Sequence, residues 1–195
     1  MRKLLAYKTF LMTYHPAALQ EAIARIKECN IRNEYSIAES IADETAKEHI
    51  KFYSDTNPGF AWEPLTVVQT SCEYGHDDPA PNCNCGVYSS YDFDRVVEAN
   101  RRAYNALEPG ADMIPVIGVI QVLGHTEVNK IAKTLRSKGG FIWGIVRPSF
   151  LNTKQFNAIQ QLTYNGYRFA EYRNAEAARK DVNRTLGYYD LYEED

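Results

Sequence analysis

The sequence lacks long apolar runs and an excess of basic residues. No stretch reaches the roughly 18 apolar residues of a membrane-spanning helix, and Tyr7, Lys8 and Thr9 interrupt the segment after Met1 where a signal peptide would need its apolar region. We therefore expect a cytoplasmic protein without membrane contact. Lys and Arg number 22 against 25 Asp and Glu, for a net charge of -3. This balance argues against binding nucleic acid mainly through bulk charge, although it leaves room for a local basic patch.

Several enzyme motifs are also missing. The sequence contains no Gly-x-Ser-x-Gly elbow of nucleophilic hydrolases and no glycine loop followed by Lys-Ser or Lys-Thr for phosphates. The His-x-Glu and Pro-Cys-x-x-Cys order of zinc deaminases is absent as well. These absences favour a protein that is not an enzyme, and they leave open an enzyme whose pocket the sequence does not reveal.

Cysteine and histidine are scarce, with four of each in 195 residues, yet three cysteines and one histidine fall within 14 positions: Cys72, His76, Cys83 and Cys85. The spacing C-x3-H-x6-C-x-C, with Gly and Pro to turn the backbone, suits tetrahedral zinc. In a reducing cytoplasm, clustered cysteines more often bind metal than form disulfides. We predict a structural zinc site, because four protein ligands leave no open position for water. The alternative is an irregular loop with three ordinary cysteines and a surface histidine.

The fourth cysteine has a different setting. Cys29 continues the face of Leu19, Ala22, Ile23 and Ile26 in a helix expected to run to about Cys29. We therefore expect it to be a buried small apolar residue without a role at the metal.

The cysteine-rich stretch resembles a motif of small uncharacterised proteins from actinobacteria and their phages, in which a Cys is followed by His-x-x-Pro and then Cys-x-Cys-Gly-Ile-Tyr-Ala. Here the stretch ends Cys85-Gly-Val-Tyr88-Ser, so Val87 and Ser89 depart from the pattern. Four further segments are similar to the family, and together the patches cover about a third of the chain: Ala6–Lys8, Trp62–Pro64, Gly118–Gly124 and Gly166–Tyr172. Residues 16–54 and 126–163 are extra relative to the family and are predicted to be helical insertions. The resemblance implies a phage or mobile-element origin but no activity.

The remaining pattern predicts an α+β fold. We expect one domain over residues 1–195, with a central mixed sheet of five or six strands, packed helices and the zinc loop at one rim. The near-continuous Ile and Val content of 113–123 predicts the central strand. The other expected strands are 3–14, 65–70, 141–146 and 167–172, and the expected helices are 16–29, 36–54, 92–107, 128–138 and 154–162, with a final helix from Asn174. A turn is expected over 55–59.

Two segments offer candidate binding residues. Lys130, Lys133, Arg136 and Lys138 would lie on the polar side of the helix expected over 128–138, where they could hold phosphates or simply face solvent. Tyr167, Arg168 and Glu171 would lie on a strand, as a recognition strip or as an edge-strand ion pair.

These features lead to two functional hypotheses. The first is a non-enzymatic, zinc-stabilised interaction or regulatory protein that binds a host or phage protein, which its 14 tyrosines favour. The alternative is a nucleic-acid-binding zinc module that uses the basic helix.

Overall fold

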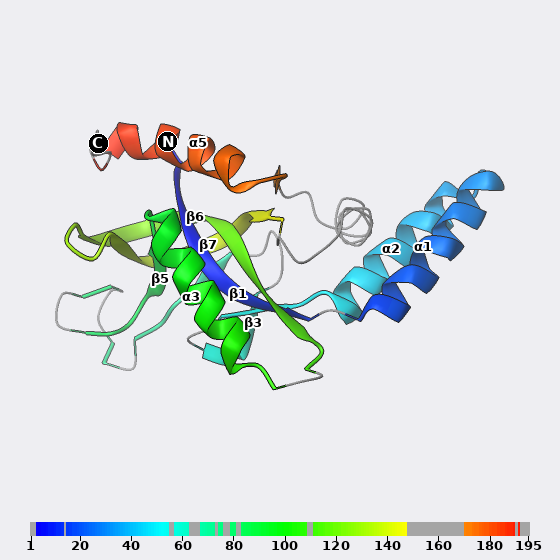
Figure 1. Cartoon of the computed structure of the whole chain (residues 1–195), viewed down its shortest axis with the longest axis horizontal. Coiled ribbons are helices and arrows are strands. Elements are labelled where there is room, and N and C mark those ends of the chain that lie inside the picture. Colours follow the sequence, from blue (N-terminus) through cyan, green and yellow to red (C-terminus); the bar gives the residue numbers. More distant parts are fainter. Residues whose placement is uncertain are drawn as a thin grey trace.

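A computed structural model describes residues 3–13, 15–54, 57–62, 67–72, 74–75, 79–80, 83–108, 111–147, 170–189 and 191 of the chain, without the side chains of residues 46–47, 57–60 and 170–171. The strands are β1 (Leu4–Thr13), β2 (Phe52–Ser54), β3 (Asn57–Trp62), β4 (Val68–Gln69), β5 (Val87–Ser90), β6 (Met113–Asn129), β7 (Thr134–Val146) and β8 (Ala170–Tyr172). The helices are α1 (Pro16–Ile31), α2 (Tyr35–His49), α3 (Phe93–Ala106) and α5 (Ala175–Leu186), and a short 3-10 helix, η1, covers Gly187–Tyr189. The predicted α+β class is confirmed, and the described residues contain eight strands where five or six were expected (Figure 1).

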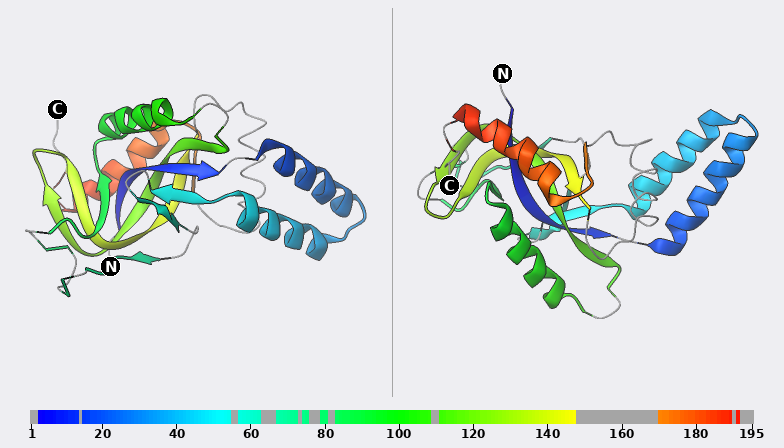
Figure 2. Two further views of the ribbon diagram at one scale, coloured as in Figure 1. Left: turned by 90° about the horizontal axis from the view of Figure 1, so that it is seen from below. Right: turned by 45° about the horizontal axis from the view of Figure 1, so that its top comes forward.

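The sheet is mixed, as expected, and it curls. β1 pairs with β6 over its whole length, β6 pairs with β7, and β5 pairs with both β7 and β1. These pairings join β1, β6, β7 and β5 into a closed ring of four strands, and the strong curvature of the sheet is visible in both views of Figure 2. The β7–β8 pair is parallel and the other recorded pairs are antiparallel. The expected central strand is confirmed, because β6 lies between β1 and β7.

β1 lies at the centre of the core. Every residue from Leu4 to Phe10 is buried, since strand pairing occupies its edges while helices cover it. α5 is tied to it by the Thr185 hydroxyl, which accepts from the Leu5 amide at 3.1 Å. A second hydrogen bond brings α3 onto the same strand, because the Thr9 hydroxyl donates to the Val96 carbonyl at 3.5 Å. α3 begins at a sequence-encoded cap, where the Asp92 carboxylate accepts from two backbone amides.

α1 and α2 form a hairpin that projects away from the sheet (Figures 1 and 2). Pro16 stands in the first turn of α1, where its missing N–H costs nothing. The two helices bury small and branched side chains against each other: Leu19, Ala22 and Ile26 from α1, and Ala38, Ile41 and Ala42 from α2. Cys29 is on this face but is only half-buried, packed beside the core.

The helix expected over 36–54 is too long at its C-terminal end. α2 ends at His49, and residues 52–54 instead form β2, which pairs with Phe10–Met12 of β1. Aromatic residues such as Phe52 and Tyr53 favour a pleated surface, and the free edge of β1 provides it. The turn expected over 55–59 is wrong from Asn57 onward, where β3 begins.

The helix expected over 128–138 is wrong. Val128 and Leu135, which looked like one helical face, are cross-strand partners in the β6–β7 hairpin. The turn between them has Lys133 at φ 49°, and the Asn129 side chain accepts from the Ala132 amide at 2.9 Å. Apolar residues seven apart fit both one face of a helix and two facing strands, so the spacing alone was ambiguous.

The predictions for the two expected insertions, two strands and one helix have mixed outcomes. In the described part of the segment 126–163, the helix expected over 128–138 is wrong, whereas the strand expected over 141–146 is observed as part of β7; residues 16–54 are mainly helical. That these segments are insertions, and that the chain is one domain, stay predictions. Within the described residues, the strand expected over 65–70 is observed as β4 and the strand expected over 167–172 as β8, and the helix expected over 154–162 lies outside those residues. Among the described helices, none is long and apolar enough to cross a membrane.

Candidate metal centre

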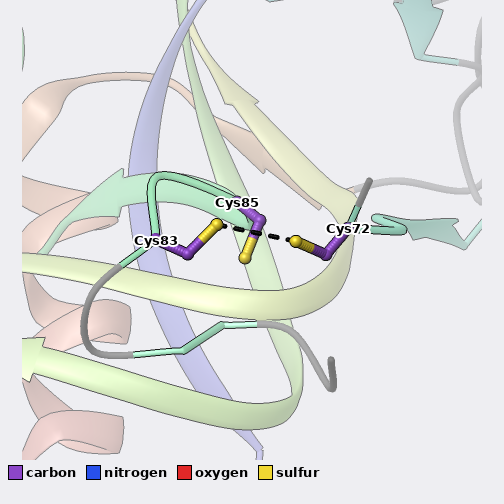
Figure 3. A group of neighbouring side chains, drawn as sticks. All are labelled: Cys72, Cys83 and Cys85. Atoms are coloured by element: carbon purple, nitrogen blue, oxygen red, sulfur yellow. Dashed lines mark hydrogen bonds between the residues drawn. The ribbon is translucent and has the colours of Figure 1, made fainter. Parts of the chain in front are cut away.

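Three of the four predicted ligands converge. The sulfur atoms of Cys72, Cys83 and Cys85 all lie within 4.8 Å of one another, and those of Cys72 and Cys83 are 3.5 Å apart (Figure 3). A disulfide would place two sulfurs at about 2.05 Å, well below the 3.5 Å between the sulfurs of Cys72 and Cys83. Sulfurs at about 2.3 Å from a tetrahedral zinc would be about 3.8 Å from each other. The three thiols are therefore close enough to bind one metal ion.

Pairing with β7 positions both halves of the cluster. β4 places Cys72 through the pairs Val68 with Gly140 and Gln69 with Gly139. Thr70 adds two contacts, since its amide and its hydroxyl both donate to the Lys138 carbonyl at 3.0 Å. On the other side, Cys85 is followed by β5, which pairs with β7 from Ser137 to Thr134. The two cysteine-bearing segments thus share one strand as their scaffold.

Arg136 of β7 supports the loop between the cysteines. Its guanidinium donates to the Ala80 carbonyl at 2.7 Å, and the Cys83 amide donates to the same carbonyl at 3.1 Å. Hydrogen bonds from charged donors are stronger than neutral ones, so this contact favours one loop conformation. The side chain of Arg136 is half-buried. The structure therefore gives Arg136 a structural contact that the sequence pattern did not predict.

Gly86 lets the loop approach β7. Its φ is +112°, and a Cβ there would lie 2.8 Å from Cγ of Arg136 and 3.1 Å from the carbonyl oxygen of Ser137. A side chain would meet both a strained backbone conformation and a fixed strand. The glycine directly after the last cysteine was the available sequence signal for this requirement.

The fourth predicted ligand, His76, lies outside the described residues. The three described positions offer cysteine sulfur atoms, and sulfur is a soft ligand that suits zinc and other thiophilic metals. Cys29 is not a member of this cluster, as predicted.

The predicted basic residues lie on the β6–β7 hairpin and its turn, not on a helix. Lys130 is exposed in the turn, and Lys133 and Lys138 are half-buried. Lys130 and Arg136 line a surface hollow together with Cys83, so part of the group does lie beside the metal centre. Tyr167 and Arg168 lie outside the described residues. Glu171 belongs to β8, where it pairs with Ile145 of β7.

A buried lysine beside the centre was missed by sequence reasoning. Lys8 is only 5% exposed, and its ammonium donates to the Tyr88 carbonyl at 3.0 Å. It lines a cavity of about 320 Å³ with Trp62, Ser71 and Gly86, the last two being next to cysteines of the centre. The local pattern gives no signal for this burial, because the curled sheet that encloses the lysine is built from segments far apart in the chain.

No known protein-family model, curated protein or solved structure matches this chain.

Proposed function

We propose that this chain is a non-enzymatic, zinc-stabilised interaction or regulatory protein of the cytoplasm, encoded by a phage or mobile element, that acts by binding another protein. The observation that carries the proposal is the tip of the α1–α2 hairpin. There, three large apolar side chains face solvent: Ile31 is 82% exposed, Tyr35 is 60% exposed and Ile37 is 49% exposed. We name these three residues the hairpin tip.

The position of the hairpin tip supports a role in binding. The hairpin stands away from the curled sheet, so the tip is presented to solvent beyond the body of the molecule (Figure 1). Large apolar side chains gathered at one exposed point are typical of contact sites in proteins. At the tip, the hydroxyl of Tyr35 donates to the Asn33 side chain at 3.0 Å. A side chain with such a local partner loses less rotamer entropy on binding than one without a partner.

Zinc is the proposed metal, with His76 completing the three cysteines. Three thiolates and one imidazole make a closed tetrahedral site, which stabilises structure and leaves no position for a reacting water. Such a site contributes on the order of 10 kcal/mol when the ligands come together only in the folded chain. Here the ion would join two segments that otherwise depend on short strands, β4 of two residues and β5 of four residues. The metal would therefore hold the rim of the sheet while the hairpin makes contact.

The proposal can be tested by cross-linking in the source cells, followed by purification of the full chain and mass spectrometry. The test variant is Ile31→Ser with Tyr35→Ser, and the matched control is Gln20→Ser with Glu21→Ser, also exposed on α1. We expect the wild type and the control to retain the same protein, and the tip variant to lose it with unchanged zinc content and melting temperature.

Two results would overturn the proposal. If the tip variant retained every cross-linked protein, the hairpin tip would not be the contact. If the wild type instead retained nucleic acid, with an affinity that falls steeply with salt, the molecule would belong to the nucleic-acid-binding class.

A further inference from the structure

A second surface shares no lining residue with the metal centre. It is a groove of about 950 Å³ between α3, β6 and the segment that joins β8 to α5. Its floor is apolar and includes Pro115, Val116 and Ile117 of β6. The volume is within the range of pockets that hold ligands.

The apolar face of α3 continues into this groove without being covered by the described residues. Phe93, Val96, Val97 and Tyr104 recur at helical spacing along one face of α3. Phe93 and Val96 are buried, but Val97 is 42% exposed and Tyr104 is 58% exposed, and both line the groove. The distal half of the stripe thus presents apolar surface where a partner side chain can pack.

Three arginines surround the same groove: Arg101, Arg147 and Arg173. The guanidinium of Arg101 is paired with Glu98 at 2.9 Å. Arg147 and Arg173 form no side-chain ion pair or hydrogen bond with another described residue. The whole chain has a net charge of -3, so these arginines form a positive patch on a protein that is negative overall. A positive patch is complementary to carboxylates.

A polar group in the groove also lacks a partner. Nδ2 of Asn100 is buried and makes no hydrogen bond within the described structure, and Asn100 lines the groove. Leaving a buried amide donor without a partner is unfavourable. We propose that this groove binds a short acidic peptide segment of another protein, with an apolar side chain against Val97 and Tyr104 and carboxylates against Arg147 and Arg173. The inference deepens the proposed function by naming a second contact and the chemistry of its partner.

The lining favours a peptide over nucleic acid. Single-stranded nucleic acid is usually held by several aromatic side chains that stack on bases. Here the exposed part of the α3 stripe offers one aromatic residue, Tyr104, beside aliphatic Val97 and the aliphatic floor. Aliphatic surface next to guanidinium groups fits an apolar residue flanked by Asp or Glu.

The test measures fluorescence anisotropy of labelled 12-residue peptides with the full-length, zinc-loaded protein. One peptide combines glutamates with leucines and a phenylalanine, a second replaces the apolar residues by serine, and a third replaces the glutamates by lysine. A 20-nucleotide single strand of DNA is the fourth probe. We expect binding of the first peptide alone, weakening as salt rises.

Two variants locate the contact. Arg147→Glu with Arg173→Glu should weaken binding at least about tenfold, because like charges across a contact repel. Arg25→Glu with Lys27→Glu makes the same change in net charge on exposed positions of α1 and should leave binding unchanged. Val97→Ser with Tyr104→Ser should weaken binding with little change in salt dependence.

Several outcomes would overturn the inference. Equal binding by the Arg147/Arg173 and Arg25/Lys27 variants would show nonspecific attraction, and preference for the DNA strand would assign the groove to nucleic acid. No binding by any probe would also reject it. If no probe binds, sedimentation of the protein alone shows whether it forms a dimer. A dimer that Val97→Ser with Tyr104→Ser disrupts would mean that a second copy fills the groove. These variants leave the hairpin tip and the cysteines intact, so failure here is separate from failure of the proposed function.

Discussion

Replacement of Gly86 by alanine should destabilise the rim of the sheet more than the same replacement at any other glycine between the cysteines or next to them. At φ +112° a residue with a Cβ is strained by about 1–3 kcal/mol. The new Cβ would also lie 2.8 Å from Cγ of Arg136, against a normal contact of about 3.5–4.0 Å. Arg136 would have to move, which would weaken its hydrogen bond to Ala80, worth about 1–2 kcal/mol. The sum is about 2–5 kcal/mol, a large part of the roughly 5–15 kcal/mol of a typical domain.

Two other glycines separate the contributions. Gly75 has φ +70° with nothing within 4 Å of the position that a Cβ would take, so alanine there should cost only the backbone strain of about 1–2 kcal/mol. Gly187 has φ -57° and open space around it, so alanine should be neutral or slightly stabilising. Urea unfolding followed by circular dichroism gives the three free energies of unfolding, in metal-loaded and chelated protein. If Gly86→Ala were as stable as Gly187→Ala, the close approach of the loop to β7 would be wrong.

Three further predictions concern the same scaffold. Arg136→Met should lower the free energy of unfolding by about 1–2 kcal/mol, because it keeps the apolar stem and removes the donor to Ala80. The control Lys130→Met, in the exposed turn, should leave it unchanged, and equal urea midpoints for the two variants would contradict the prediction. Cys29→Ala should leave the bound metal per chain unchanged in metal analysis, and a loss of metal would place Cys29 in the site. Burial raises the pKa of Tyr7 well above its usual value near 10, so this tyrosine ionises first in the unfolded chain, and the free energy of unfolding should fall as pH rises above about 10. Tyr7→Phe should reduce that fall, measured by urea unfolding at about pH 8 and about pH 11. An unchanged fall would refute the prediction.

Much of the fold could be predicted from local patterns. β1, α1, α3 and the core of β6 are strongly periodic or nearly continuous in apolar residues, and Pro16 and Asp92 mark helix starts by their chemistry. The errors arose where long-range pairing decided the outcome. β2 and the β6–β7 hairpin exist because neighbouring strands offer edges, and residues far apart in sequence supply those edges.

The candidate site shows the same division. The spacing of the cysteines was sufficient to predict that Cys72, Cys83 and Cys85 meet, because few short loops carry three thiols without such a role. The contribution of Arg136 was hidden, since it depends on the register of β5 against β7 and on the position of Ala80. Charge alone made Arg136 look like a solvent-facing residue. A side chain's role at such a site follows from what it contacts, which the pairing of distant strands determines.

The proposed zinc centre is tested most directly by metal analysis of freshly purified protein, with melting temperatures measured before and after chelation. We expect one equivalent of zinc per chain, a marked fall in melting temperature with chelator, and loss of both the metal and the chelator effect in Cys83→Ser. Substitution of the zinc by cobalt should give the absorption of a tetrahedral thiolate site. Protein that contains no metal, and melts at the same temperature with and without chelator, would rule out a structural zinc centre.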